Sequence, residues 1–265
     1  MNQDFANKQK YVIGLVIYYP KKNLFKRVEE ITQLGYIVYI FDNSPDEERY
    51  TGSLKKKSNI FYLTAGTNVG ISYALSTICA TARAHGHHRL LFLDQDTGIS
   101  SNTLEFVSNQ LQTEMPLTQS KYAALVFDGT TAKKKCVEDI TFAISSGSLF
   151  CLHILKQIGW HNLQYFVDCV DYEFCLRAKR NGFRIGKIRN TPDFDHVSEQ
   201  PDRIVKILGK SFLVRKYSTK RIRDSVKAYS RLIFGEVKRG NVKNGIDLVR
   251  SFTISAVGQI LSRIK

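Results

Sequence analysis

Two aspartates one residue apart, Asp94 and Asp96, directly follow the apolar run Leu90–Leu93. Side chains at i and i+2 of a strand point to the same side. Both carboxylates can therefore face one hard cation and the diphosphate that the cation clamps. In an open α/β sheet, ligands bind beyond the carboxyl ends of the strands. Taken alone, the pattern is equally typical of an acidic turn that closes a hairpin.

An Asp-x-Asp pair after an apolar strand also occurs in phosphatases of the haloacid dehalogenase type. Those enzymes have Thr or Val two positions after the second Asp. Here Gly98 occupies that position, and Thr97 comes one residue too early. Transfer of a sugar from a nucleoside diphosphate therefore fits the pattern better.

A sheet of mostly parallel strands is predicted around this pair. The near-continuous apolar runs over 11–20 and 36–45 are typical of strands buried on both faces, and Pro20 stops the first. Apolar residues at helical spacing predict a helix from Asn23 to Leu34 between them. Strand, helix and strand form a βαβ unit, which indicates an α/β fold.

Further elements follow in the same manner. The sequence predicts a strand over 60–64, a turn and helix over 65–86, a helix over 102–113, apolar segments over 122–127 and 141–150, a helix over 171–182 and a strand over 183–188. The last of these helices is the best marked, because Glu173 and Arg177 can pair one turn apart and Gly182 stops it.

The formal net charge of +15 is concentrated towards the carboxyl end of the chain. Residues 203–265 contain 16 Lys and Arg against three acids, whereas the first 202 residues contain 23 against 21. Such asymmetry indicates a polyanionic partner, either nucleic acid or an anionic membrane surface.

The remaining composition predicts a cytoplasmic chain. The polar start and the apolar run after it, which has no small-residue cleavage site, do not form a secretory leader. Five cysteines without a C-x-x-C pair favour reduced thiols and argue against a structural zinc site. An exposed turn accounts for the neighbouring His85, His87 and His88.

Five motifs follow one another along the chain: FDNS (41–44), TNVGISYA (67–74), LDQDT (93–97), ISSGSL (144–149) and FVDCVDYEFCLRAKRNGF (166–183). In this order they resemble the inverting family 2 glycosyltransferases of GT-A fold, and most closely their bacterial rhamnosyltransferase branch. The resemblance covers about residues 11–200. The chain departs from it at Ser76, where the branch usually has Asn. It also has Val170 where the wider family often has Glu, a departure common in the rhamnosyltransferase branch.

The resemblance implies a divalent metal, Mg²⁺ or Mn²⁺, which prefers oxygen ligands. Asp96 then corresponds to the direct metal ligand, and Asp94 lies nearer the ribose of the donor. His196, in the segment DFDHVS (193–198), is a candidate third ligand. A structural histidine is an equally good interpretation of that residue.

Asp171 corresponds to the family's catalytic base, which takes the proton of the acceptor hydroxyl. It lies at the start of a predicted helix, where the helix dipole stabilises an ionised carboxylate. The alternative is a plain helix cap, a role that Asp168 can also fill.

The remaining site residues in the resemblance surround the nucleotide sugar. Asp42 accepts the N3–H of a uracil or thymine ring, or else closes an Asx-turn. Asn68 and Gly70 let the backbone approach the nucleotide. The floor on which donor sugar and acceptor meet is formed by Ser145, Ser146 and Gly147.

The sequence therefore predicts an inverting glycosyltransferase that passes L-rhamnose from dTDP-rhamnose to a hydroxyl of a lipid-linked intermediate of a bacterial surface polysaccharide, O-antigen or capsule. A UDP-hexose-dependent enzyme of the same family is an alternative. A sugar-nucleotide nucleotidyltransferase needs a G-x-G-T-R-like loop after the first strand, where this chain has YYPKKN (18–23). A non-catalytic module that binds nucleic acid explains the basic residues but not the strand-end carboxylates.

The sequence predicts a GT-A catalytic domain over 1–202 and a basic helical appendage over 203–265. The appendage is predicted to contact a membrane surface or another subunit of an oligomer. One side of a final helix gathers Leu248, Val249, Phe252, Ala256, Ile260 and Ile264. Arg250, Gln259 and Arg263 argue against a membrane-spanning segment. An apolar side with scattered cations suits the headgroup region at the cytoplasmic face of the inner membrane. Alternatively, this side packs on the catalytic domain or on a second copy of the chain.

Overall fold

A computed structural model describes residues 10–45, 57–114, 120–132, 137–196, 203–207, 210–214 and 216–263. The chain divides into two compact units, Met1–Leu163 with Val170–Val197, and Gln164–Cys169 with Ser198–Lys265. The predicted boundary after residue 202 falls within 197–202, which lies outside the described residues.

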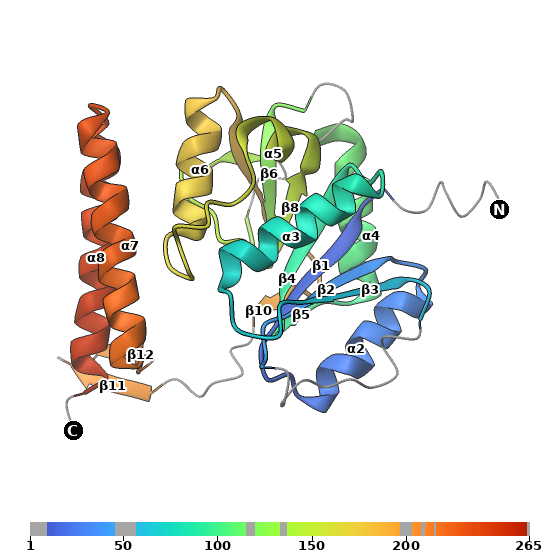
Figure 1. The fold of residues 1–265 in the computed structure, drawn as a ribbon, viewed down its shortest axis with the longest axis horizontal. Helices are drawn as coiled ribbons and strands as arrows, with labels where there is room; N and C mark the ends of the chain where they lie inside the picture. Colours follow the sequence, from blue (N-terminus) through green and yellow to red (C-terminus); the bar gives the residue numbers. More distant parts are fainter. Residues whose placement is uncertain are drawn as a thin grey trace. The chain divides into compact units, whose positions relative to one another are not determined.

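The first unit is built on one mixed sheet (Figure 1). Its strands are β1 (Val12–Ile17), β2 (Val38–Asp42), β3 (Ile60–Thr64), β4 (Arg89–Asp94), β6 (Tyr122–Phe127), β7 (Glu138–Asp139), β8 (Ser148–Cys151) and β9 (Arg184–Ile188), in the order β3-β2-β1-β4-β8-β6-β9-β7. Neighbours among β3, β2, β1 and β4 are parallel, β8 is antiparallel to β4 and to β6, and β6 is parallel to β9. The carboxyl ends of β2, β4 and β6 therefore lie at one edge.

The helices of this unit are α2 (Lys22–Gln33), α3 (Ile71–Ala84), α4 (Ser101–Glu114), α5 (Leu152–Ile158) and α6 (Val170–Arg180). β1 and β6 are buried along their full lengths, as expected of strands covered on both faces. The predicted α/β class is confirmed. The short strands β5 (Thr97–Gly98) and β10 (Asp195–His196), which pair with each other, were not predicted, because two residues carry no periodic signal.

The cysteines of the described part of the chain do not form disulfides. Cys79, Cys151, Cys169 and Cys175 are free and buried. Cys136 lies outside the described residues.

The second unit contains a strand pair and two long helices. β11 (Arg203–Ile207) and β12 (Lys210–Val214) form an antiparallel pair, followed by α7 (Thr219–Lys238) and α8 (Val242–Leu261), which lie side by side (Figure 1). Glu236 is fully buried, and its Oε2 accepts hydrogen bonds from the side-chain amides of Asn241 and Asn244, at 3.1 and 3.0 Å. These bonds fix the turn between the helices. The helical appendage is thus present, and the strand pair before it was not predicted.

The predicted apolar side of α8 is divided between two environments. Leu248 is fully buried, and the ring of Phe252 lies 5.1 Å from the ring of Tyr229 on α7. Val249 and Ile260 are exposed, and Ile264 lies outside the described residues. The side therefore packs in part on α7, a partner that the sequence analysis did not consider. Within the described residues, each helix is too short or too polar to cross a membrane.

Candidate active site

Asp42 and Asp94 stand at the same edge of the sheet. Asp42 ends β2 and pairs with Ile17 of β1, and Asp94 ends β4 and pairs with Val16 of β1. Adjacent strands are about 4.8 Å apart, so the two backbones are about 10 Å apart across β1. The carboxyl ends of parallel strands are where open sheets bind ligands.

The carboxylate of Asp42 is buried and held from two sides. The backbone N–H of Ser44 donates to its Oδ1 at 2.8 Å, which is the Asx-turn considered above. The hydroxyl of Tyr62 donates to its Oδ2. Each carboxylate oxygen has a second lone pair, so the contact with a pyrimidine N3–H stays a prediction. Tyr62 lies 20 residues away on β3, and no local sequence pattern pointed to it.

A turn that precedes α3 is tied to the end of β2. The side chain of Asn43 accepts from the N–H of Val69 at 3.2 Å and donates to the carbonyl of Gly70 at 3.3 Å. The side chain of Asn68 accepts from the N–H of Gly70 at 3.0 Å. Gly70 has a φ of 84°, in the left-handed region that favours glycine. The structure thus places Asn68 and Gly70 beside Asp42.

Asp94 and Asp96 flank Gln95 at the end of β4. The side chain of Gln95 accepts from the N–H of Tyr18 at 2.9 Å, and its carbonyl accepts from Arg27 at 2.5 Å. Gln95 therefore anchors this turn to the loop after β1 and to α2. Its role was missed because both partners are remote in sequence.

The carboxylate of Asp94 lies in a negatively charged environment. Burial raises its pKa to about 7, and the nearby carboxylates of Asp96 and Asp171 act in the same direction. Asp96, two residues beyond the end of β4, and Asp171, on α6, are thus close enough to repel the carboxylate of Asp94, and a bound cation would relieve that repulsion.

The loop Ser145–Gly147 joins these acidic groups. The Oγ of Ser146 accepts from the N–H of Asp94 at 3.1 Å, and the hydroxyl of Ser145 donates to Oδ1 of Asp171. Gly147 has a φ of 74°, and a Cβ on it would collide with the ring of Phe194. The structure therefore brings together the predicted loop, Asp94 and Asp171.

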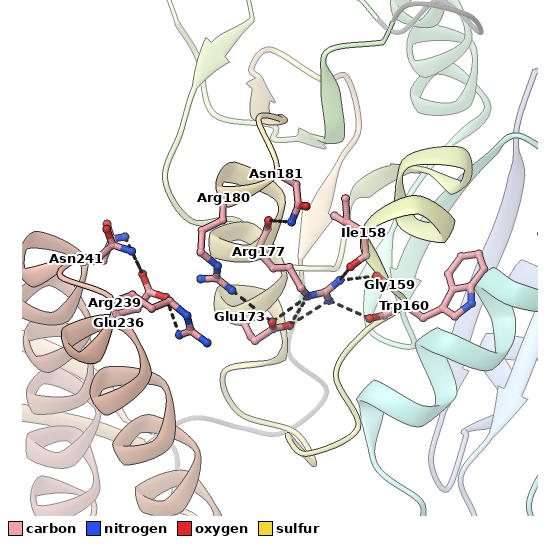
Figure 2. A network of polar contacts seen from close by, with 11 residues as sticks. Ile158, Gly159, Trp160, Glu173, Arg177, Arg180, Asn181, Glu236, Arg239 and Asn241 are labelled. Carbon is pink, nitrogen blue, oxygen red and sulfur yellow. Dashed lines mark hydrogen bonds and ion pairs between the residues drawn. The ribbon is translucent and has the colours of Figure 1, made fainter.

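A buried ion pair anchors the helix that carries Asp171. Figure 2 shows Arg177 between Glu173 and the end of α5. Its Nε donates to Glu173 at 2.9 Å, and its two NH groups donate to the carbonyls of Ile158 and Trp160, each at 2.9 Å. The guanidinium thus satisfies carbonyls beyond the end of α5, and it fixes α6 against α5.

Asp168 belongs to the second unit. Its Oδ1 accepts from the guanidinium of Arg221 on α7 at 2.8 Å. Its carboxylate thus has a partner on α7, whereas that of Asp171 contacts the loop beside Asp94.

The residues at the end of β4 fit a divalent metal ion. Their oxygen donors suit hard cations, and Mg²⁺ is commonly held by one or two carboxylates with substrate phosphates. Among the side chains that the structure describes, no group of three His, Cys, Asp or Glu forms a metal cluster. The backbone of His196 pairs with Thr97, next to Asp96. The side chain of His196 lies outside the described part, so its role as a ligand stays a prediction.

Three solved structures have folds similar to that of this chain. A structure of S. aureus TarS has a TM-score of 0.53 at 15% identity over 70% of this chain and 36% of its own. TarS 1-349 in complex with UDP-GlcNAc gives 0.51 at 14% over 73% and 63%. GalNAc-T7 with UDP, GalNAc and Mn²⁺ gives 0.57 at 10% over 84% and 48%. The chain spans less than two thirds of each of these chains, and it shares with them the GT-A glycosyltransferase fold.

At the level of sequence, the comparison is more specific. No family model matches the chain. The dTDP-rhamnosyl transferase RfbF of Shigella flexneri is 26% identical over 222 residues, which cover 74% of this chain and 71% of that protein. The predicted resemblance to the family 2 glycosyltransferases of GT-A fold is confirmed.

Proposed function

We propose that the chain is an inverting glycosyltransferase that moves L-rhamnose from dTDP-rhamnose to a hydroxyl of a bacterial surface-polysaccharide intermediate. The main support is the loop Ser145–Gly147, which contacts both Asp94 at the end of β4 and Asp171 on α6. A single site thus holds carboxylates for a metal-bound diphosphate and another carboxylate for proton transfer.

Each residue has a defined task in this mechanism. Asp171 takes the proton from the acceptor hydroxyl, and the hydrogen bond from Ser145 orients its carboxylate. Asp96 would hold Mg²⁺ or Mn²⁺, with Asp94 nearer the ribose, and an ion held there would supply positive charge against the departing diphosphate. Asp42 accepts from the pyrimidine ring, beside the turn that contains Asn68 and Gly70.

The product should have the inverted anomeric configuration. One carboxylate base without a covalent intermediate implies a single in-line displacement, which inverts the reacting carbon. Proton NMR of the purified glycoside, compared with that of the donor, measures this directly. A product that retains the configuration of the donor contradicts the proposed role of Asp171.

The proposed donor rests on the RfbF relative, whereas a TarS structure contains UDP-GlcNAc. A thermal-shift panel of dTDP-, UDP- and GDP-sugars, with and without Mn²⁺, separates the two possibilities. At 100 times its dissociation constant, the preferred donor stabilises the fold by about 2.7 kcal/mol. We expect the largest shift with dTDP-rhamnose and Mn²⁺. A larger shift with a UDP-hexose assigns the alternative donor.

The second unit is proposed to bind the cytoplasmic face of an anionic membrane, where a lipid-linked acceptor would be presented. This proposal is supported by an exposed apolar side of α8. The exposed residues on that side recur at helical spacing: Val242, Ile246, Val249, Val257 and Ile260. Lys243 and Arg250 are exposed on the same helix. An apolar side beside cations suits the headgroup region of an anionic bilayer.

Full-length protein should therefore co-sediment with liposomes that contain anionic lipid, and less so as salt rises. Each cation near the surface contributes about 1 kcal/mol, so Lys243→Gln with Arg250→Gln should weaken partitioning about 30-fold. Lys26→Gln, on α2 of the first unit, removes another exposed charge as the control. If full-length protein ignores anionic liposomes at low salt, α8 is reassigned to contacts between copies of the chain.

A further inference from the structure

A cleft of about 590 Å³ opens in the first unit. This volume is within the range of about 300–1,000 Å³ that is usual for small-molecule sites. The residues that matter for its chemistry are Asp128, Phe142, Ser146, Tyr172, Lys187 and Phe194. They come from the ends of β6 and β9, the segment before β8, the start of α6 and the segment before β10.

The cleft adjoins the proposed active site through two residues. Ser146 lines it and also contacts the backbone of Asp94. Tyr172 lines it and follows Asp171 on α6. In the sheet, β8 lies between β4 and β6, the strand that leads to the cleft. Asp42, at the end of β2, lies on the opposite side of β4, two strands away. A nucleotide at Asp42 therefore leaves this cleft free for a second substrate.

One part of the cleft is aromatic. The rings of Phe142 and Tyr172 are 4.8 Å apart at an angle of 48°, and both residues are half-buried. Phe194 adds a third ring. Aromatic surfaces of this kind pack on the C–H faces of a ring, and they lose little conformational entropy on binding.

Another part of the cleft is polar but balanced in charge. Nζ of Lys187 lies 2.9 Å from Oδ2 of Asp128, and the N–H of Thr130 donates to Oδ1 at 2.7 Å. Burial alone would raise the pKa of Asp128, but the bonds from Thr130 and Lys187 outweigh it and hold that pKa below its usual value. The two side chains therefore form an ion pair, and Arg189, 4.0 Å from the same Oδ2, is itself paired with Glu138 at 3.1 Å. The charges here are thus paired, and the side chains offer hydrogen bonds to hydroxyl groups.

We propose that this cleft binds the acceptor, and that the part of the acceptor held there is an uncharged pyranose. The sugar packs one C–H face on Phe142 and Tyr172 and directs hydroxyl groups to Asp128 and Lys187. One further hydroxyl is then presented to Asp171. This inference rests on the proposed function, since it assigns the second substrate of the same reaction.

The test uses saturation-transfer NMR on the full chain with dTDP and Mg²⁺ present. The probes are methyl α-L-rhamnoside, methyl β-D-glucoside and methyl α-D-galactoside, with glucose 6-phosphate as the charged probe. Phe142→Ala should reduce the saturation transferred from the protein to the best neutral glycoside by about tenfold or more. Phe142→Tyr should leave this saturation transfer unchanged. Leu34→Ala, which removes an exposed apolar side chain that follows α2 and does not line the cleft, is the control.

The affinity for dTDP, measured by calorimetry, should be the same in all these variants, which also shows that they fold. The cleft proposal is overturned if Phe142→Ala still binds the glycoside like the wild type. It is also overturned if protein that binds dTDP ignores every neutral glycoside or prefers glucose 6-phosphate. If the wild type binds neither dTDP nor UDP with Mn²⁺, it is the proposed function that fails.

Discussion

Asp96→Ala is expected to abolish sugar transfer and metal-dependent nucleotide binding while the chain keeps its fold. A metal ion held by carboxylate stabilises the departing diphosphate by several kcal/mol, so kcat/KM should fall by about 10³-fold or more. Burial is the main cause of the raised pKa of Asp94, and removal of the nearby Asp96 carboxylate takes away a smaller, repulsive contribution. The fold should therefore not be weakened. Initial rates, calorimetry with dTDP and Mn²⁺, and thermal unfolding measure the three effects.

A chelator added to the wild type should reproduce the loss of activity. Glu30→Ala is the matched control, because it removes a carboxylate that is 60% exposed on α2 and pairs with Lys26 at the surface. Normal turnover by Asp96→Ala after removal of Mn²⁺ contradicts the metal site.

Asp171→Asn is expected to lower kcat by about 10²–10⁴-fold, the usual contribution of general base catalysis. The amide keeps the shape of the side chain and an oxygen that can accept the hydrogen bond from Ser145. It cannot accept the proton of the acceptor hydroxyl. Donor affinity should change little, since the variant removes a group that acts on the acceptor.

Asp168→Asn is the control, because Asp168 lies three residues earlier and its carboxylate contacts Arg221 in the second unit. We expect kcat to stay near the wild-type value. If calorimetry shows that Asp171→Asn weakens the donor as much as it slows turnover, Asp171 becomes a residue of the donor site.

The elements with a clear pattern of apolar residues were predictable from the sequence. β1 and β2 are nearly continuous apolar runs, and α6 begins and ends within two residues of its predicted bounds. The strand-end aspartates were predictable too, because a carboxylate after a buried strand has a known place in a parallel sheet. The order of motifs then led to the loop Ser145–Gly147 and to Asp171.

Contacts between distant residues were not predictable. Tyr62 holds Asp42, Gln95 anchors the loop after β1, and Arg177 reaches past the end of α5, each through partners that no local pattern connects. The packing of α8 in the second unit was not predictable for the same reason. Apolar residues occur on two sides of α8, and only the position of α7 decides that Leu248 is buried while Val249 is exposed.

The place of β8 between β4 and β6 has a consequence for the evolution of such enzymes. Two interstrand spacings, about 10 Å in all, separate the strand that ends in Asp94 from the strand that leads to Asp128. Mutations on β6 and β9 can therefore accumulate without disturbing β1, β2 and β4. If the cleft binds the acceptor as proposed, one scaffold can diversify its acceptors while the donor site stays the same.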